Sequence, residues 1–341
     1  MIRKKIYWIV LAAIPVMTFL TIIAFGELYY RYASRGCIYQ YDQEVGWVPK
    51  KSTHYSVVRP DAAGVNYNIV LSTDQHGFRS WGNIDTDKKK IFFIGDSFTG
   101  DPNMSDEDAY YDQVKKNLDV EIFAFGGGGY GTLQELIITK KYINIIRPDY
   151  FVLQFCSNDF SNNSFILEEK MIVRNQKNLR PYYGGDKIVY RDADVYRFLY
   201  ANSYLFRGID LSVQKMQFKI YKGYYPPQSL NDKEKTIKDT AEAERITQNL
   251  LKMMADSVPK ETKLFTFTCS TSTSQEKEAW IRVTQKAGFI SLPMVSEAVE
   301  RSEKEGVVVR AADKAHWGSK GHHIAGKVLA DELRKIMKDE K

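Results

Sequence analysis

Several short segments of the sequence carry side chains that together could perform acyl transfer. Ser97 stands in IGDSFTG, directly after the apolar run Ile91 to Ile94. Asp313 and His316 stand three residues apart in DKAH, near the C-terminus. A carboxylate at that spacing can orient an imidazole, and an oriented imidazole can take the proton of a serine hydroxyl. Asn158, in QFCSNDF, adds an amide that could donate to an oxyanion.

Each segment also has a purely structural interpretation. Asp and Ser are common N-caps, so GDS could open a helix, whose N-terminus would favour negative charge near Ser97. Asn158 could close an Asx-turn at the end of its strand. Asp313 and His316 could cap a helix or form half of a metal site, although further ligands at suitable spacing are missing. The combination is more specific than its parts, because nucleophile, base, orienting acid and neutral donors form the full set for acyl transfer.

A glycine run contributes a further segment. Three glycines of AFGGGGYGT form the pattern G-x-G-x-x-G of dinucleotide-binding turns: Gly126, Gly128 and Gly131. A dinucleotide site also needs an acidic residue at the end of the following strand. Here Asp149 opens that strand and Phe155 and Cys156 end it. We therefore interpret the run as a tight turn that lets a backbone N–H approach a reacting carbonyl.

The elements that would position these segments alternate along the chain. Apolar runs typical of buried strands are Ile91 to Ile94, Val120 to Phe125, Tyr150 to Phe155, Leu264 to Cys269 and Phe289 to Met294. Helical patterns are Asp108 to Leu118, Leu133 to Ile146, Glu242 to Met254, Lys277 to Ala287 and Gly321 to Met337. This alternation predicts an α/β fold with a parallel sheet covered on both faces. Ligands bind beyond the carboxyl ends of such strands, where the serine, the glycines and the asparagine lie.

The N-terminal region predicts a membrane anchor. A basic segment, residues 3–5, precedes the charge-free run Ile6 to Phe25, which is long enough to cross a ~30 Å hydrocarbon layer. Tyr29, Tyr30 and Arg31 follow, as in an interfacial belt. This order predicts a cytoplasmic N-terminus and an extracytoplasmic body. A cleaved signal peptide is the alternative, since small residues lie near the end of the run. The apolar core of a signal peptide, however, is normally only about 7 to 15 residues long.

Composition adds limits to the function. The 341 residues carry a formal net charge of +6, and the basic clusters are short. This distribution does not indicate a nucleic-acid-binding stripe. Cys37, Cys156 and Cys269 match neither a metal-site nor a disulfide-framework spacing. One pair could form a disulfide in an oxidising compartment, and the sequence leaves open which pair.

The chain is predicted to have three parts. Residues 1–31 are the transmembrane anchor, and residues 32–89 are a juxtamembrane segment with a small hairpin. In that segment, the strand-like Tyr67 to Ser72 precedes the turn residues DQHG, and the aromatic residues of Cys37 to Lys51 are expected to pack on the body. Residues 90–341 are the catalytic domain, with an aromatic-rich insertion at about 160–230. The aromatic rings of the insertion either pack on the body or stack on sugar rings.

The motifs resemble, in chain order, the four blocks of the SGNH hydrolases, also called GDSL esterases and lipases. These blocks are GDSF around Ser97, the glycine run, SND at Asn158, and DKAH from Asp313 to His316. The likeness covers roughly residues 90–335. The approach segments GWVPK and STDQHGFRS also resemble those of membrane-anchored or secreted bacterial members.

The resemblance implies a flavodoxin-like, three-layer α/β/α sandwich with a mostly parallel sheet of about five strands. It also implies a serine mechanism without metal or cofactor. Ser97 would attack an ester carbonyl, His316 would take the serine proton, and Asp313 would hold the imidazole ring. The oxyanion would be received by the backbone N–H groups of Ser97 and Gly129 and by the side chain of Asn158.

Three positions depart from the family pattern. Ala124 replaces the Asn that commonly starts the second block, and Gly129 is counted from that position. Cys156 stands where the third block often has Gly, and Phe98 replaces the Leu of GDSL. The first two changes alter the floor of the pocket but remove no catalytic atom, and Phe at the third position is common in anchored members of the family.

These observations predict an esterase or acyl transferase in the bacterial inner membrane, with its catalytic domain in the periplasm or outside the cell. Its substrate would be an O-acylated, above all O-acetylated, carbohydrate of the cell envelope or another ester, and a lipase is a further option. Hydrolysis and transfer share the acyl-enzyme, so the sequence does not separate them. The alternative is a non-catalytic anchored subunit that serves as an interaction platform, for instance for a membrane-protein partner. A nucleotide-binding enzyme would rest on the glycines alone.

Overall fold

The structure is a computed structural model that describes residues 2–169, 179–185, 187–191, 194–224, 233–269 and 274–339. The chain forms two compact units, each built from two segments of the sequence. The smaller unit comprises Met1–Cys37 and Asp192–Asn231, and the larger comprises Ile38–Arg191 and Asp232–Lys341.

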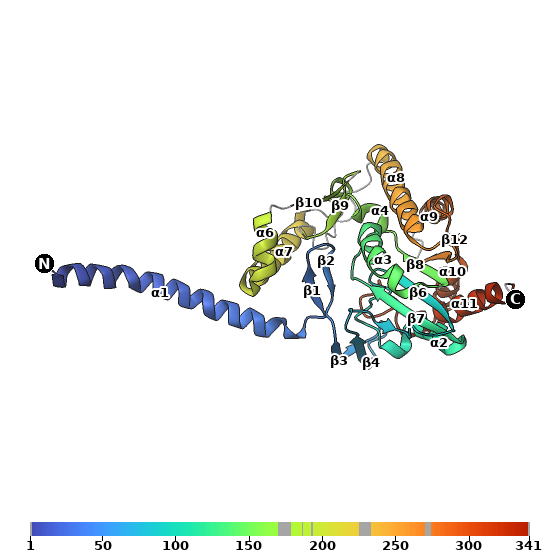
Figure 1. Ribbon diagram of the computed structural model, residues 1–341, viewed down its shortest axis with the longest axis horizontal. Helices are drawn as coiled ribbons and strands as arrows, with labels where there is room; N and C mark the ends of the chain where they lie inside the picture. Colours follow the sequence, from blue (N-terminus) through green and yellow to red (C-terminus); the bar gives the residue numbers. More distant parts are fainter. Residues whose placement is uncertain are drawn as a thin grey trace. The chain divides into compact units, whose positions relative to one another are not determined.

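The larger unit is built on a six-stranded sheet (Figure 1). Its strands are, in spatial order, β12 (Ile290–Ser291), β11 (Lys263–Thr268), β8 (Tyr150–Phe155), β6 (Lys89–Gly95), β7 (Val120–Gly126) and β5 (Ser80–Trp81). All neighbours are parallel except β5, a two-residue edge strand that runs antiparallel to β7. The predicted mostly parallel sheet is confirmed, with this short edge strand added.

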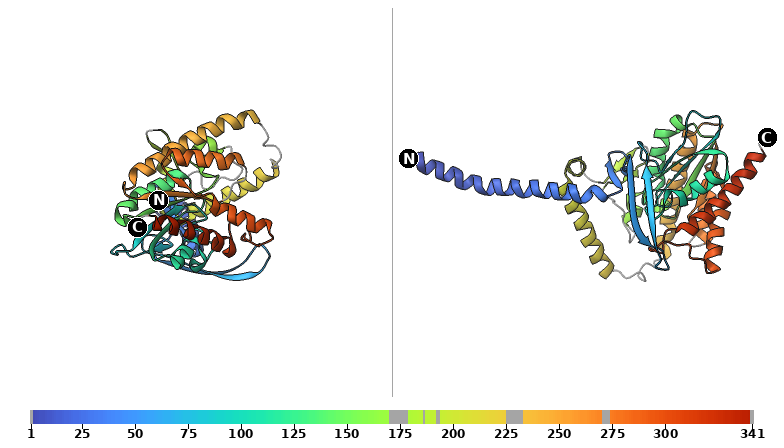
Figure 2. Two further views of the ribbon diagram at one scale, coloured as in Figure 1. Left: turned by 90° about the vertical axis from the view of Figure 1, so that its right-hand side faces the viewer. Right: turned by 90° about the horizontal axis from the view of Figure 1, so that it is seen from below.

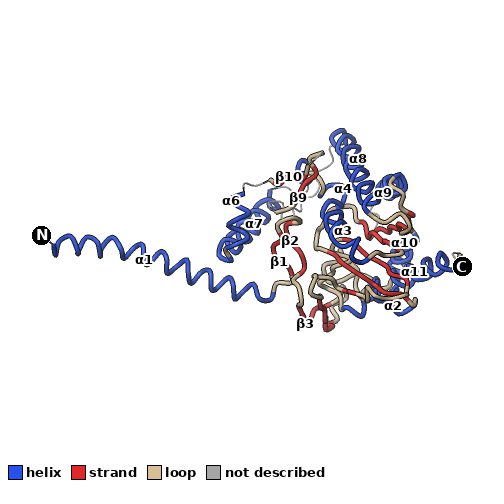
Figure 3. Tube along the Cα trace, viewed as in Figure 1, coloured by secondary structure: helices blue, strands red, loops and turns tan. Residues whose placement is uncertain are grey.

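Helices cover both faces of the sheet (Figures 1 and 3). On one face lie α2 (Tyr110–Asn117), α10 (Met294–Lys304) and α11 (Ser319–Lys338); on the other lie α3 (Thr132–Ile146), α8 (Lys233–Ser257) and α9 (Ser274–Lys286). Buried side chains of the first three helices, such as Val114, Val299 and Leu329, join Phe93 and Val152 of the strands in one apolar core. The predicted α/β/α sandwich is therefore confirmed.

The carboxyl ends of the central strands are in register. Gly95 at the end of β6 is paired with Gly126 of β7 and with Gln154 of β8. Phe155 of β8 is paired with Thr268 of β11. The residues that follow these strands therefore meet at one edge of the sheet.

Two hairpins precede the sheet, β1 (Tyr39–Asp42) with β2 (Gly46–Pro49) and β3 (Thr53–Pro60) with β4 (Asn66–Thr73). The small hairpin predicted before the main domain is present as β3 and β4, and the strand predicted at 67–72 lies in β4. Its partner β3 precedes it, so the turn of the hairpin is not at DQHG. Asp74 Oδ1 accepts the backbone N–H groups of His76 and Phe78, which closes the DQHG turn without a returning strand. The last strand is also shorter than expected, because Pro293 cannot donate to the ladder and α10 begins at Met294.

The predicted insertion contributes to both units. The larger unit contains α4 (Asp159–Asn162), α5 (Phe165–Glu169), β9 (Pro181–Tyr183) and β10 (Ile188–Tyr190), and also the 3-10 turn η2 (Asp106–Asp108). The smaller unit contains α1 (Ile2–Ala33), η1 (Ser34–Gly36), α6 (Asp194–Asn202) and α7 (Tyr204–Tyr224). The stretch Val10–Gly36 contains a helical segment that is long and apolar enough to cross a membrane and is unburied.

Candidate active site

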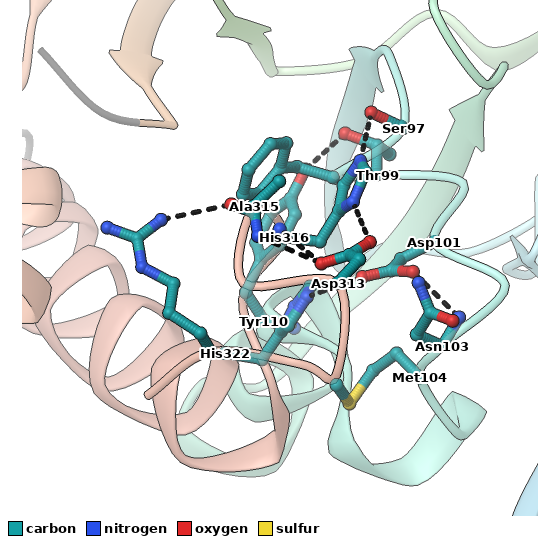
Figure 4. A network of polar contacts seen from close by, with 12 residues as sticks. Ser97, Thr99, Asp101, Asn103, Met104, Tyr110, Asp313, Ala315, His316 and His322 are labelled. Atoms are coloured by element: carbon teal, nitrogen blue, oxygen red, sulfur yellow. Dashed lines mark hydrogen bonds and ion pairs between the residues drawn. The ribbon is translucent and has the colours of Figure 1, made fainter. Parts of the chain in front are cut away.

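The structure brings Ser97, His316 and Asp313 together (Figure 4), although Ser97 and His316 are 219 positions apart in the sequence. Ser97 Oγ lies 2.8 Å from His316 Nε2, and His316 Nδ1 lies 2.6 Å from Asp313 Oδ2. When Nδ1–H donates to the carboxylate, Nε2 is the acceptor that faces the hydroxyl. A neutral imidazole in this arrangement can take the serine proton.

Ser97 lies in a tight turn that follows β6. The Asp96 carboxylate accepts the N–H of Phe98 at 3.0 Å, and the Asp96 carbonyl accepts the N–H of Gly100 at 3.0 Å. A Cβ at Gly100 would collide with the backbone of β7, so glycine is required for this close approach. The alternative that GDS opens a helix does not occur: Gly100 and Pro102 interrupt the chain, and α2 begins at Tyr110, near the predicted start at Asp108.

Asp313 and His316 belong to one turn before α11. Asp313 Oδ1 accepts the backbone N–H groups of Ala315 at 2.9 Å and His316 at 3.0 Å, while Oδ2 faces the imidazole. Lys314 between them adopts a left-handed conformation with φ +60°. The Phe98 ring packs on the imidazole with centroids 5.0 Å apart. The turn and the ring together fix the orientation of His316.

The surrounding charges favour the protonated imidazole. Burial acts to lower the pKa of His316, but the carboxylates of Asp101, Asp313 and Asp96 outweigh burial and raise this pKa. Burial acts to raise the pKa of Asp313, but hydrogen bonds from the backbone and side chain of His316 outweigh it and lower this pKa. An imidazolium formed by proton transfer from Ser97 would therefore be stabilised.

Side chains from distant segments hold the glycine loop that follows β7. Gly128 N–H donates to Tyr39 Oη at 2.9 Å, and Trp47 Nε1 donates to Gly128 O at 3.0 Å. Gly129 has φ +68°, which favours glycine, and its carbonyl accepts Arg180 Nη2 at 2.8 Å. Side chains of the protein thus hold the loop in one conformation.

Three groups with N–H donors lie near the strand ends. Within the ranges that the structure describes, the backbone N–H groups of Ser97 and Gly129 have no acceptor. Asn158 Nδ2 donates to Tyr130 O at 2.9 Å, and the Asn158 side chain also hydrogen-bonds the Asp96 carboxyl group. The three groups follow β6, β7 and β8, and the two backbone N–H groups are uncommitted, as donors to an oxyanion must be.

The departures from the family pattern have structural reasons. Ala124 is fully buried within β7, and Phe98 packs on His316 as described. Cys156 forms a disulfide with Cys269, with Cα atoms 5.4 Å apart, which joins the ends of β8 and β11. Cys37 is free and exposed. The structure thereby selects one of the pairings that the sequence left open.

Three buried carboxyl groups, those of Asp96, Asp159 and Glu135, lie near the candidate site. Asp159 accepts the N–H of Cys156 at 2.8 Å and the hydroxyl of Thr132 at 3.1 Å. Both carboxyl oxygens of Glu135 lack a hydrogen-bond partner in the described part of the chain. Burial is the largest cause that raises all three pKa values, that of Asp96 to about 6 and the other two well above their ordinary range.

Sequence reasoning did not identify Tyr39, Trp47 or Arg180 as residues of the site. The expectation that juxtamembrane aromatic residues pack on the body is confirmed for Tyr39 and Trp47, but their hydrogen bonds to the glycine loop were not foreseen. The only signal was GWVPK, which contains Trp47. Among the residues described, no group of three or more His, Cys, Asp or Glu side chains could hold a metal ion.

Several solved structures are similar to this chain. A lipase/acylhydrolase from Enterococcus faecalis is 16% identical, with a TM-score of 0.40, and the alignment covers 72% of this chain and 96% of that one. An acetylxylan esterase from Geobacillus stearothermophilus is 13% identical, with a TM-score of 0.41 and coverage of 73% and 95%. The psychrotrophic esterase EstA from Pseudoalteromonas sp. is 9% identical, with a TM-score of 0.40 and coverage of 73% and 99%. No curated protein sequence matches this chain.

Residues 91–198 match the family model described as GDSL-like Lipase/Acylhydrolase. The match contains the GDS turn at Ser97, the glycine loop and the SND segment at Asn158, while the turn with Asp313 and His316 lies beyond it. The hydrogen bond between Ser97 and His316 joins this matched region to the C-terminal turn. Residues 91–198 therefore correspond to a GDSL-like lipase/acylhydrolase domain, the domain type of the SGNH serine hydrolases.

Proposed function

We propose that this protein is a membrane-anchored, extracytoplasmic serine esterase or acyl transferase that acts on O-acetyl or other O-acyl groups of a cell-envelope glycan. The observation that carries the chemistry is the chain of contacts from Ser97 Oγ through His316 to Asp313. The disulfide between Cys156 and Cys269 supports an oxidising compartment. The glycan is proposed from this location and from the aromatic-rich insertion.

In the proposed reaction, Ser97 Oγ attacks the ester carbonyl while His316 Nε2 takes the hydroxyl proton. The N–H groups of Ser97 and Gly129 and the amide of Asn158 would donate to the oxyanion that develops. His316 then returns the proton to the leaving alcohol, which gives acyl-Ser97. Water or a sugar hydroxyl attacks the acyl-enzyme next, with His316 again taking and returning one proton.

The proposed location is the bacterial inner membrane, with residues 6–25 of α1 in the bilayer. The basic residues of segment 3–5 would keep the N-terminus in the cytoplasm. The catalytic unit would then lie in the periplasm or outside the cell, where the disulfide is stable.

Fluorophosphonate labelling of the purified protein tests the nucleophile. We expect one label per chain at Ser97 and none in the Ser97→Ala variant, with equal thermal melting of the two proteins. A folded wild type without label would contradict the enzyme proposal and favour the interaction platform. Acetate release from isolated envelope glycans, compared between the wild type and Ser97→Ala, tests the substrate class. If the wild type is labelled by the fluorophosphonate but releases no more acetate than Ser97→Ala, the serine chemistry stands and hydrolysis of O-acetyl glycans is excluded. Transfer would then be tested by adding an acceptor sugar.

A further inference from the structure

The smaller unit exposes apolar side chains on one face of each of two helices. On α6 they are Val195, Phe198 and Leu199, and on α7 they are Ile209, Val213 and Met216. The spacings i, i+3, i+4 and i, i+4, i+7 place each set on one side of its helix. These six side chains, the apolar stripe, are 39–68% exposed. Large apolar side chains gathered in this way mark an interaction surface.

The N-terminus of α7 is fixed to α1. Glu27 of α1 accepts the backbone N–H groups of Tyr204 at 2.8 Å and Leu205 at 2.9 Å, and the hydroxyl of Ser203 at 2.9 Å. A carboxylate at this position satisfies N–H groups that have no partner within the helix. The start of α7 is therefore anchored just after the charge-free run Ile6 to Phe25.

Close packing reinforces this junction. A Cβ at Gly208 would collide with the ring of Tyr30, and Gly26 lies against Leu205. The final turns of α1 are therefore part of the folded unit, and α7 runs across α1 (Figure 2). Signal peptidase cleavage near Gly26 would cut into this packed helical junction.

Arginine and tyrosine side chains surround the junction. Arg31 of α1 lies 5.4 Å from the ring centroid of Tyr204, and Arg207 lies 4.6 Å from the same ring. Arg207 also lies 5.7 Å from the ring of Tyr200. Tyrosine and arginine are the side chains that gather where a membrane protein leaves the hydrocarbon layer.

We propose that α6 and α7 lie on the outer surface of the same bilayer that α1 spans, with the apolar stripe inserted among the lipid acyl chains at the interface. The proposal rests on the anchoring proposed above. Lipid is the occupant because the stripe belongs to the same unit as the exposed apolar α1, and Glu27, just after the charge-free run of α1, holds the start of α7. The other sides of α7 carry Asp210, Gln214 and Lys215 together with the exposed Leu211, so this helix suits the interface and not a membrane crossing.

Depth-dependent quenching in lipid vesicles tests this inference on the full chain. Cys37→Ser removes the free thiol, so that a fluorophore attaches only to an introduced cysteine. Val213→Cys and Phe198→Cys probe the stripe, and Lys215→Cys is the matched control two residues away on another side of α7. Leu20→Cys probes α1 itself. The vesicles contain phosphatidylethanolamine and phosphatidylglycerol with a spin label at shallow or deep positions, and iodide reports exposure to water.

We expect shallow spin labels to quench positions 213 and 198 severalfold more than position 215, and iodide to quench position 215 most. Deep spin labels should quench position 20.

If position 20 is quenched but positions 213 and 215 respond alike, the anchoring stands and the interfacial inference is overturned. If position 20 is also unquenched, the anchoring itself is wrong. A third outcome would overturn the inference in favour of a protein partner. In that outcome, position 213 is protected from both quenchers in native membranes but is not quenched by spin-labelled lipid in pure vesicles. Fluorophosphonate labelling of the same samples reads the serine chemistry separately.

Discussion

Trp47 donates its indole N–H to Gly128 O at 3.0 Å, and this bond fixes the direction of the Gly129 N–H. The described chain has no cis peptide, so the carbonyl of residue 128 and the N–H of residue 129 share one plane and point in opposite directions. Trp47 lies in β2, outside the residues matched to the family. The N-terminal hairpin therefore orients the proposed oxyanion donor.

Replacing Trp47 with Phe keeps an aromatic ring and removes the donor. Loss of an oxyanion donor lowers the rate about 10²-fold or more, and misorientation of a donor should lower the rate less. We therefore expect kcat of the variant to fall about 10-fold or more. Steady-state hydrolysis of p-nitrophenyl acetate measures this change, and KM should change little.

The matched control is Trp280→Phe. Trp280 is also buried, and its indole N–H donates to Thr266 Oγ1 at 3.3 Å, between α9 and β11. This variant should lose stability and keep its kcat. Equal losses of kcat in the two variants would indicate a general effect on the fold and contradict the orienting role of Trp47.

Asn158→Ala removes an amide that could donate directly to the oxyanion. We expect kcat to fall by about 10² to 10³, because the side chain would act mainly in the transition state. Ser157→Ala, at the exposed neighbouring position, should leave kcat within a few fold of the wild type. A loss of less than about 10-fold in Asn158→Ala would remove this residue from the proposed oxyanion site.

The raised pKa of His316 predicts the pH dependence of activity. The base must be neutral, so kcat/KM should fall as the pH drops through the His316 pKa, at a value above the ordinary ~6.5. Asp101 is the first of the carboxylates that raise this pKa, so Asp101→Asn should move the acidic limb to lower pH. The pH profile of kcat/KM checks both statements, with melting temperatures to verify folding. An unchanged limb in folded Asp101→Asn would show that this carboxylate does not act on His316.

The sequence could predict the sheet, most helices of the larger unit and the segments that carry Ser97 and His316, because each depends on a local pattern. Apolar runs mark the strands, and GDS and DKAH are contiguous motifs around Ser97 and His316. Trp47 and Arg180 could not be predicted, because their hydrogen bonds to the glycine loop arise only when a distant hairpin and the insertion pack on β7. α10 is not among the predicted helices, because the apolar run at 289–294 resembles a strand and Pro293 and Met294 are counted in it. The pairing of Cys156 with Cys269 likewise depends on β8 and β11 being neighbours.

The disulfide predicts one free thiol per chain, at Cys37. Alkylation of the unfolded, unreduced protein followed by mass spectrometry should modify Cys37 alone. Cys269→Ala should lower the free energy of unfolding by about 2 to 5 kcal/mol, as is typical for loss of a native disulfide. Cys37→Ser should leave it unchanged, since this thiol is exposed. Three modified cysteines in unreduced wild type would mean that the bond does not form.

Glu135 predicts a stability that decreases with pH. Burial is the largest cause that raises the pKa of Glu135, so the folded chain keeps a proton that the unfolded chain releases above ~4.3. The free energy of unfolding then decreases as the pH rises from that value towards the folded pKa, by at most about 1.4 kcal/mol per pH unit.

Glu135→Gln retains the shape of the side chain and cannot ionise. This variant should therefore be more stable than the wild type, and by more at pH 8 than at pH 5. Thermal melting at the two pH values measures the difference, with Glu261→Gln at an exposed position as the control. If the advantage of Glu135→Gln is equal at both pH values, Glu135 does not retain its proton in the folded protein, and the buried carboxylate must be stabilised by some other group.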